Sequence, residues 1–165
     1  MEIERKYLVR RLPADYASYP FLEIEQGYLS TSPTLRIRRM GDAYILTVKE
    51  HRATQQGGPI INREEEFSLT AETYSHLRTK CDGIFVCKTR YRINLEEYMG
   101  DRSYRGLTAE LDLFHGLHEG LMLVEVEFPD EEAANVFVKP DWFGDDVSLD
   151  PRYRNSFLSS VHNFL

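Results

Sequence analysis

The sequence predicts a mainly antiparallel β fold of the α+β class, in which eight strands close into a tunnel barrel with a charged lumen and a few outer helices. One observation is that short segments throughout the chain alternate in character with period two, as strands with two unlike faces do. A second is that one face is charged in almost every segment, with the two signs nearly balanced. Because charged residues seldom go inside unless they are paired or bind a metal, these faces either contact water or meet in one site.

The first strand shows this pattern at the very start of the chain. Read as a strand, it places Glu2, Glu4 and Lys6 on one face, with Ile3, Arg5 and Tyr7 on the other. Two carboxylates and an ammonium group then follow one another along a single face. This face is either solvated or a site for a metal ion and an anion.

The later strands repeat this one-sided charge. The residues on the charged faces of these strands are Arg36, Arg38, Lys49, Glu64, Glu66, Lys88, Arg90, Arg92, Glu110, Asp112, Glu125 and Glu127. Arg39 and Glu65 point to the opposite face of their strands, and we expect them on the surface. For any single strand, the two charged residues on one face could simply contact water or pair with charges on the neighbouring strand. In that alternative, Glu66 and Glu110 are structural partners of the arginines. If the sheet closes, all these residues face one lumen and the exposed sheet edges disappear. Such a lumen suits a polyanion with divalent cations, since basic groups hold phosphate oxygens and carboxylates hold metals.

Three short helices are predicted to cover part of the apolar outer face. They span residues 71–80 after a Thr70 cap, residues 131–138 after an Asp130 cap, and a C-terminal stretch that starts at Asn155 or Ser156. Their predicted apolar faces comprise Tyr74, Leu77 and Cys81, then Ala134, Phe137 and Val138, and finally Phe157, Leu158, Val161 and Leu165.

Two loops and one ambiguous segment complete the chain. Residues 55–59 are rich in glycine and predict a loop between two strands. His115 and His118 flank a glycine, and we expect both in a surface turn rather than in a metal site. The segment 152–155 is predicted either to plug one tunnel mouth or to contact the substrate.

Composition narrows the class of protein. The 165 residues form one expected domain, 1–165, which is long enough to bury a core. No apolar run is long enough to span a membrane, and we expect no secretory segment before the first strand. Cys81 and Cys87 lack a zinc pattern, which favours the cytoplasm. A net charge of −7 argues against nucleic acid as a partner, so an anionic substrate would need a local basic cluster.

The ordered set of motifs resembles the CYTH, or triphosphate tunnel metalloenzyme, superfamily. The N-terminal Glu2-x-Glu4-x-Lys6 is similar to the ExExK signature of that superfamily. The other matching motifs are Gln26-Gly27-Tyr28-Leu29, Leu35-Arg36-Ile37-Arg38, Thr47-Val48-Lys49, Glu64-x-Glu66, Lys88-Thr89-Arg90-Tyr91, Glu110-Leu111-Asp112, Val124-Glu125-Val126-Glu127-Phe128 and Trp142-Phe143-Gly144. They cover almost the whole chain and look most similar to the short bacterial inorganic triphosphatases.

This resemblance implies roles for the site residues. The carboxylates that it assigns to Mg²⁺ or Mn²⁺ are Glu2, Glu4, Glu64, Asp112, Glu125 and Glu127. The basic residues that it assigns to the triphosphate are Lys6, Arg36, Arg38, Lys49, Arg90 and Arg92. It also implies that Tyr28 and Lys88 activate the attacking water, although Tyr28 alternatively packs at a strand start.

Several functions remain open at this point. The leading hypothesis is metal-dependent hydrolysis of the terminal phosphate of inorganic triphosphate. Alternatives are a class IV-type adenylyl cyclase, a thiamine triphosphatase, and a non-enzymatic module that binds polyphosphate or a nucleotide. Tyr91 could stack on a base in the nucleotide alternatives. Oligomeric state stays open, with a homodimer as the commonest symmetric assembly.

Overall fold

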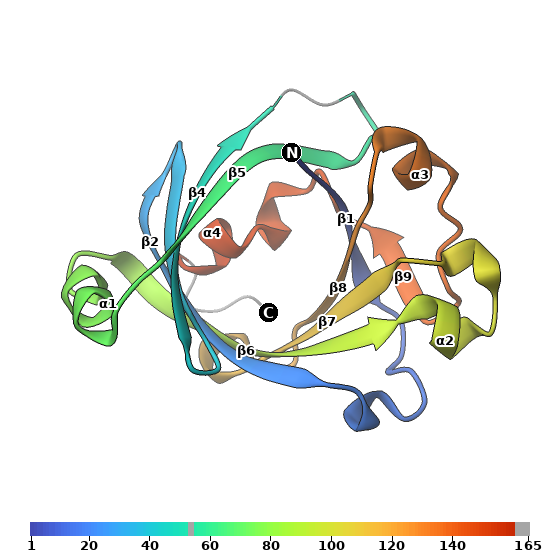
Figure 1. Cartoon of the computed structure of the whole chain (residues 1–165), viewed down its shortest axis with the longest axis horizontal. Coiled ribbons are helices and arrows are strands. Elements are labelled where there is room, and N and C mark those ends of the chain that lie inside the picture. The colour runs from blue at the N-terminus through green and yellow to red at the C-terminus, as the bar shows by residue number, and fades with distance from the viewer. Residues whose placement is uncertain (53–54, 161–165) are drawn as a thin grey trace.

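The computed structural model describes residues 1–52 and 55–160. Its strands are β1 (Glu2–Val9), β2 (Phe21–Thr31), β3 (Thr34–Met40), β4 (Ala43–His51), β5 (Ile60–Ser68), β6 (Asp82–Asn94), β7 (Thr108–Phe114), β8 (Met122–Glu127) and β9 (Phe143–Asp146). Their order in the sheet is β5-β4-β3-β2-β6-β7-β8-β1-β9. A further pairing between β5 and β1 closes the first eight strands into a barrel (Figure 1). The predicted closed antiparallel barrel is confirmed, and β9 is an added strand beside β1.

The strand registers bring charged residues of neighbouring strands together. On β1 and β8, Glu4 is paired with Glu127 and Lys6 with Glu125. Opposed residues on paired strands point to the same face of a sheet. The period-two charge therefore accumulates inside the barrel, as the sequence predicts.

The apolar faces of the strands pack outside the barrel. The larger core cluster includes Tyr7, Val124 and Val126 from the strands, packed with Trp142 and Phe143 of the C-terminal part. The ring centroids of Trp142 and Phe143 lie 4.5 Å apart in an edge-to-face arrangement. This outer layer holds β1 and β8 in place and so positions the charged residues on their inner faces.

The described residues form four short α-helices beside the strands: α1 (Ala71–Arg78), α2 (Leu95–Met99), α3 (Glu131–Val136) and α4 (Asn155–Leu158). The predicted caps of α1 and α3 are confirmed. The Thr70 side chain accepts a hydrogen bond from the Thr73 amide, and Asp130 accepts one from Ala133. The sequence pattern does not predict α2. No helix in the described part of the chain has the length and apolar character needed to cross a membrane.

The C-terminal helix differs from its prediction. Instead of covering the outside, α4 lies across the barrel interior in Figure 1, and residues 154–156 line the tunnel. Leu158 is buried as predicted, whereas Phe157 is exposed. The predicted Val161 and Leu165 lie outside the described residues.

Two further predictions about single residues are wrong. Val138, predicted on the buried face of its helix, is exposed because α3 ends at Val136. His118, predicted on the surface, is buried, and its Nε2 lies 2.7 Å from the backbone oxygen of Leu158. This contact ties the loop before β8 to α4, an interaction between distant parts of the chain that local turn chemistry does not reveal.

Candidate active site

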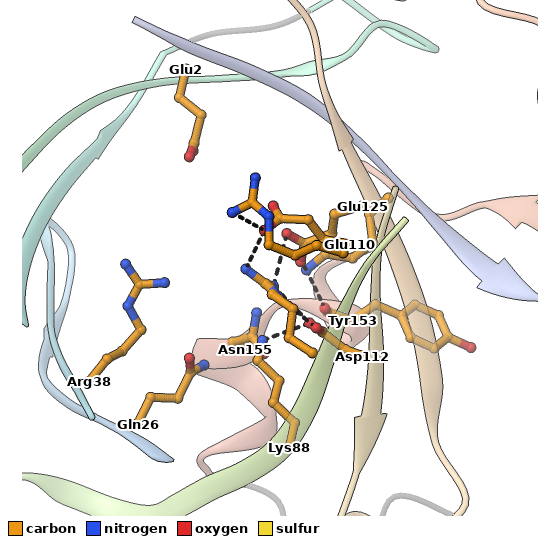
Figure 2. Close-up of polar contacts among 12 residues, drawn as sticks. Glu2, Gln26, Arg38, Lys88, Glu110, Asp112, Glu125, Tyr153 and Asn155 are labelled. Atoms are coloured by element: carbon orange, nitrogen blue, oxygen red, sulfur yellow. Dashed lines mark hydrogen bonds and ion pairs between the residues drawn. The ribbon is translucent and has the colours of Figure 1, made fainter. Parts of the chain in front are cut away.

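A cavity of about 640 Å³ occupies the barrel interior. Arg36, Glu64 and Arg90, from three different strands, all line it, so the predicted common lumen is confirmed. Figure 2 shows Arg38 on one side of the lumen and Glu110 and Glu125 on the other, with Gln26 and Lys88 on the neighbouring strands β2 and β6 between them. The cavity thus has two chemically distinct walls.

Most of the predicted site residues line this cavity. They are Glu2, Glu4, Lys6, Tyr28, Arg36, Arg38, Lys49, Glu64, Lys88, Arg90, Glu125 and Glu127. Glu66 and Glu110, which sequence parity also placed on the charged face, belong to the same lining.

Arg92 and Asp112 are placed differently. The Arg92 side chain is 54% exposed and lines a second hollow, between the segment before β7 and the one after β8. Arg92 lies near the end of β6, beyond the part of this strand that lines the lumen. Asp112 is only 1% exposed and lies behind the cations of the wall, not in the cavity lining.

Asp112 is the centre of a buried ion-pair network on one wall. Arg90 donates to both of its carboxylate oxygens, from Nε at 2.7 Å and from Nη2 at 2.8 Å. The Lys88 Nζ atom lies 2.8 Å from Oδ2 of the same carboxylate. Burial would raise the pKa of Asp112, but the charges of Arg90 and Lys88 outweigh burial and hold this pKa below its usual value. Asp112 therefore stays ionised and fixes two cations.

Glu125 links this network to the first strand. One of its oxygens lies 3.4 Å from Arg90 Nη2, and the other lies 3.5 Å from Lys6 Nζ. Burial opposes ionisation, yet the surrounding cations hold the pKa of Glu125 well below its usual range. The Lys6 ammonium group also donates to the backbone oxygen of Tyr153 at 2.9 Å.

The opposite wall carries cations with fewer partners. Arg38 pairs with Glu66 at 2.9 Å, and burial together with Arg36 and Arg90 lowers the pKa of Arg38 to about 10. The Nε atoms of Arg36 and Arg38 are buried and have no hydrogen-bond partner within the described residues. Buried donors without partners are costly, so this wall offers N–H groups to an incoming anion.

A third cluster joins β1, β4 and β5. Lys49 Nζ lies 2.8 Å from Glu2 and 3.6 Å from Glu64. Asn62 donates to the same Glu2 oxygen at 3.2 Å. This ion-paired cluster holds β1 against β5, where the barrel closes.

Glu4 lies between these clusters without an ion pair of its own among the described residues. Burial and the negative charges of Glu125 and Glu2 raise the pKa of Glu4 to about 8. No three acidic, histidine or cysteine side chains in the described ranges are grouped closely enough to hold a metal ion by themselves. The oxygen donors nevertheless match Mg²⁺, which usually binds one or two carboxylates together with substrate phosphates and water.

Lys88 is the most deeply buried cation of the site, at 2% exposure. Burial and the neighbouring Arg90 lower the pKa of Lys88 to about 8, against the opposing effect of Asp112. Its ammonium group also lies 3.3 Å from Oδ1 of Asn155 on α4. A lysine with this pKa exchanges a proton near neutral pH, as a general base requires.

Some site residues are missed or left ambiguous by sequence reasoning. The segment 152–155, predicted either to plug the tunnel or to contact substrate, supplies groups to Lys6 and Lys88. Asn155 carries no periodic signal because α4 has only four residues. Gln26 is part of a matching motif without an assigned role, although its position two residues before Tyr28 could have drawn attention to it.

Two curated proteins are similar to this chain over nearly their full length. The chain is 38% identical over 162 residues to an inorganic triphosphatase of Nitrosomonas europaea, covering 96% of each chain. It is 36% identical over 159 residues to an inorganic triphosphatase of Acetivibrio thermocellus, covering 95% of this chain and 92% of that one. No protein-family model matches the chain.

Solved structures give the same result for the fold. The crystal structure of the inorganic triphosphatase NE1496 has a TM-score of 0.67 at 35% identity, covering 98% of this chain and 95% of that one. HpAC1 from Hippeastrum, an adenylyl cyclase candidate with a dominant triphosphatase activity, has a TM-score of 0.61 at 14% identity, covering 82% and 83%. The second likeness concerns the fold alone. The identity and coverage of the curated relatives show that this chain belongs to the family of inorganic triphosphatases.

Proposed function

We propose that this protein hydrolyses the terminal phosphate of inorganic triphosphate with the help of a divalent metal ion. The observation that carries the proposal is the closed lumen, in which arginines with unpartnered N–H groups face a wall of carboxylates and a buried lysine. The similarity to two inorganic triphosphatases over nearly the full chain supports the same substrate.

Binding would rest on the cations of both walls. Arg36 and Arg38 have Nε–H groups free to donate to phosphate oxygens, and guanidinium groups suit phosphate geometry. Three further cations already have carboxylate partners and would therefore attract the triphosphate mainly through their positive charge. They are Lys6, Lys49 and Arg90. Phosphoryl transfer needs mainly positioning and charge neutralisation, which such a lumen supplies.

Mg²⁺ or Mn²⁺ is part of the proposal. Glu2, Glu4, Glu64, Glu125 and Glu127 are the carboxylates that would hold it. When bound, the metal would neutralise phosphate charge and lower the pKa of a coordinated water. Asp112, which the resemblance assigns to the metal, is already held by Arg90 and Lys88. We therefore propose that Asp112 keeps those two cations in place.

Lys88 and Tyr28 are proposed to handle the proton of the attacking water. The low pKa of Lys88 favours a neutral amine at mildly alkaline pH, which could accept this proton. Tyr28 is nearly buried but reaches the cavity lining. Its hydroxyl could orient the water or donate to a phosphate oxygen.

One substrate panel tests this function. Tripolyphosphate, ATP and thiamine triphosphate would be offered with Mg²⁺ or Mn²⁺, with phosphate release and cyclic AMP both measured. We expect the highest kcat/KM for tripolyphosphate and no turnover in excess chelator. Cyclic AMP formation would favour a cyclase, preference for thiamine triphosphate would favour the organic substrate, and binding without turnover would favour a binding module.

The location in the cytoplasm and the assembly into a homodimer remain predictions. Cys81 and Cys87 are free thiols, which supports the proposed location in the cytoplasm. A homodimer would be tested by sedimentation of the purified protein.

A further inference from the structure

Gln26 is a fully buried amide on the inner side of β2. It is 0% exposed, and its Nε2 donates to the Tyr28 hydroxyl oxygen at 3.3 Å. Its Oε1 atom has no hydrogen-bond partner among the described residues. A buried amide with an unsatisfied oxygen is costly, and such a group in a folded protein calls for an explanation.

The backbone of β2 brings Gln26 and Tyr28 to the same side of the sheet. The pairing with β6 is irregular here, since Gln26 opposes Val86 but Tyr28 opposes Asp82. Gly27 lies between them with the Phe85 ring directly against its outer side. The two side chains therefore both turn inward, away from Phe85.

Gln26 also adjoins the phosphate-facing wall. It is the register partner of Arg38 on β3, whose Nε likewise has no partner in the described part of the chain. Figure 2 shows the Gln26 amide below Arg38 at the edge of the lumen. Its surroundings are thus the site itself and not the apolar core.

The direction of the hydrogen bond fixes the Tyr28 proton. Because the phenol oxygen accepts from the Gln26 amide, its own hydrogen must point elsewhere. No other hydrogen bond involves the Tyr28 side chain within residues 1–52 and 55–160, and Tyr28 lines the cavity. The remaining direction for the O–H group is the lumen.

We propose that Gln26 is a positioning residue, whose amide N–H holds the Tyr28 hydroxyl so that its proton is presented to substrate or water in the tunnel. This inference rests on the proposed role of Tyr28 in the reaction. The donated hydrogen bond also stabilises the phenol oxygen as negative charge develops on it, so Gln26 acts through Tyr28 and does not need to touch the substrate.

A double-mutant cycle on kcat tests the inference. Gln26→Met keeps the size of the side chain and removes the donor. We expect Gln26→Met to lower kcat about fivefold in the wild-type background, as loss of one neutral hydrogen bond would, with little change in KM. In the Tyr28→Phe background, which lacks the hydroxyl, the same substitution should change kcat less than about twofold.

Gln26→Glu tests the direction of the hydrogen bond between Gln26 and Tyr28. It also provides a second test if Gln26→Met fails to fold. The new carboxylate can accept a hydrogen bond but has no N–H to donate. The Tyr28 hydroxyl would then donate its hydrogen bond to this carboxylate and no longer point into the lumen. We expect at least the same loss of kcat. Ile24→Val, on the same inner face of β2, is the packing control and should be additive with Tyr28→Phe.

Two results would overturn the inference. One is an equal effect of Gln26→Met with and without the Tyr28 hydroxyl, which would make Gln26 a structural or substrate-contacting residue. The other is full activity of Gln26→Glu, which would make the amide an acceptor. Failure of the proposed function is distinguishable, because wild-type protein would then not hydrolyse tripolyphosphate at all.

Discussion

The Lys88 ammonium group lies 2.8 Å from the Asp112 carboxylate, and both side chains are almost fully buried. Arg90 binds the same carboxylate through two nitrogens, so one acid serves two cations. Burial and Arg90 lower the pKa of Lys88, while Asp112 opposes that change. Asp112 thus holds Lys88 in place and limits how far its pKa can fall.

Asp112→Asn should destabilise the protein strongly. Removing Asp112 takes away the carboxylate partner of Lys88 and leaves Arg90 with only Glu110 and Glu125, each at 3.4 Å, and Arg90 cannot lose its proton to relieve the deficit. We expect a loss of about 3–5 kcal/mol in the free energy of unfolding, measured by urea denaturation. Glu127→Gln is the control, because Glu127 is exposed and should change stability by about 0.5 kcal/mol or less. Equal effects of the two substitutions would show that Asp112 is not the countercharge.

Lys88→Ala and Arg38→Ala should affect different kinetic constants. A proton acceptor acts mainly in the transition state, so Lys88→Ala should lower kcat about 100-fold with a modest change in KM. Tyr28→Phe should also lower kcat more than it raises KM. Arg38→Ala removes a ground-state phosphate contact and should raise KM about tenfold. Steady-state kinetics on tripolyphosphate decide this, and a Lys88→Ala variant changed only in KM would make Lys88 another phosphate ligand.

Much of the fold follows from sequence because barrel residues alternate inward and outward. That single rule predicts Glu4, Arg36 and Glu64 in one lumen, and all three line the cavity. It fails where strand position, and not parity, decides exposure. Arg92 has the correct parity but lies near the end of β6, outside the lumen.

Contacts made by irregular segments could not be predicted. Asn155 reaches Lys88 from a helix of four residues, and His118 contacts the Leu158 backbone from a short loop. Neither contact leaves a periodic signal, because each depends on how the end of the chain folds back over the tunnel. The sequence pattern therefore predicts the strand walls of the site better than the part that the C-terminal segment lines.

Glu4 should make stability depend on pH when metal is absent. A carboxyl group whose pKa is raised in the folded state stabilises the protein below its unfolded pKa, and this contribution is lost as pH rises through about 8. In chelator, wild-type Tm should therefore fall between pH 5 and pH 8.5 more than the Tm of Glu4→Gln. At pH 8.5 we expect Glu4→Gln to melt on the order of 3 °C higher, and at pH 5 nearly the same.

Adding Mg²⁺ provides the control for that experiment. Metal should raise wild-type Tm at pH 8.5, because it compensates the negative charge around Glu4, and should raise the Tm of Glu4→Gln less. Parallel Tm–pH curves for the two proteins in chelator would mean that Glu4 ionises normally in the folded state.

Gly27→Ala should disturb β2 between Gln26 and Tyr28. A Cβ atom at this position would lie 2.6–2.9 Å from three ring carbons of Phe85, closer than real Cβ contacts allow. Either the ring or the strand must move, and the Arg78 guanidinium, 4.0 Å from the centre of that ring, restricts the ring. We expect a loss of about 1–3 kcal/mol in unfolding free energy, as for other overpacked sites, together with a lower kcat because Tyr28 shifts. Phe85→Leu should relieve the clash, so Gly27→Ala should cost much less in that background than in the wild type. If Gly27→Ala is equally costly in both backgrounds, the backbone at residue 27 and not the Phe85 ring requires glycine.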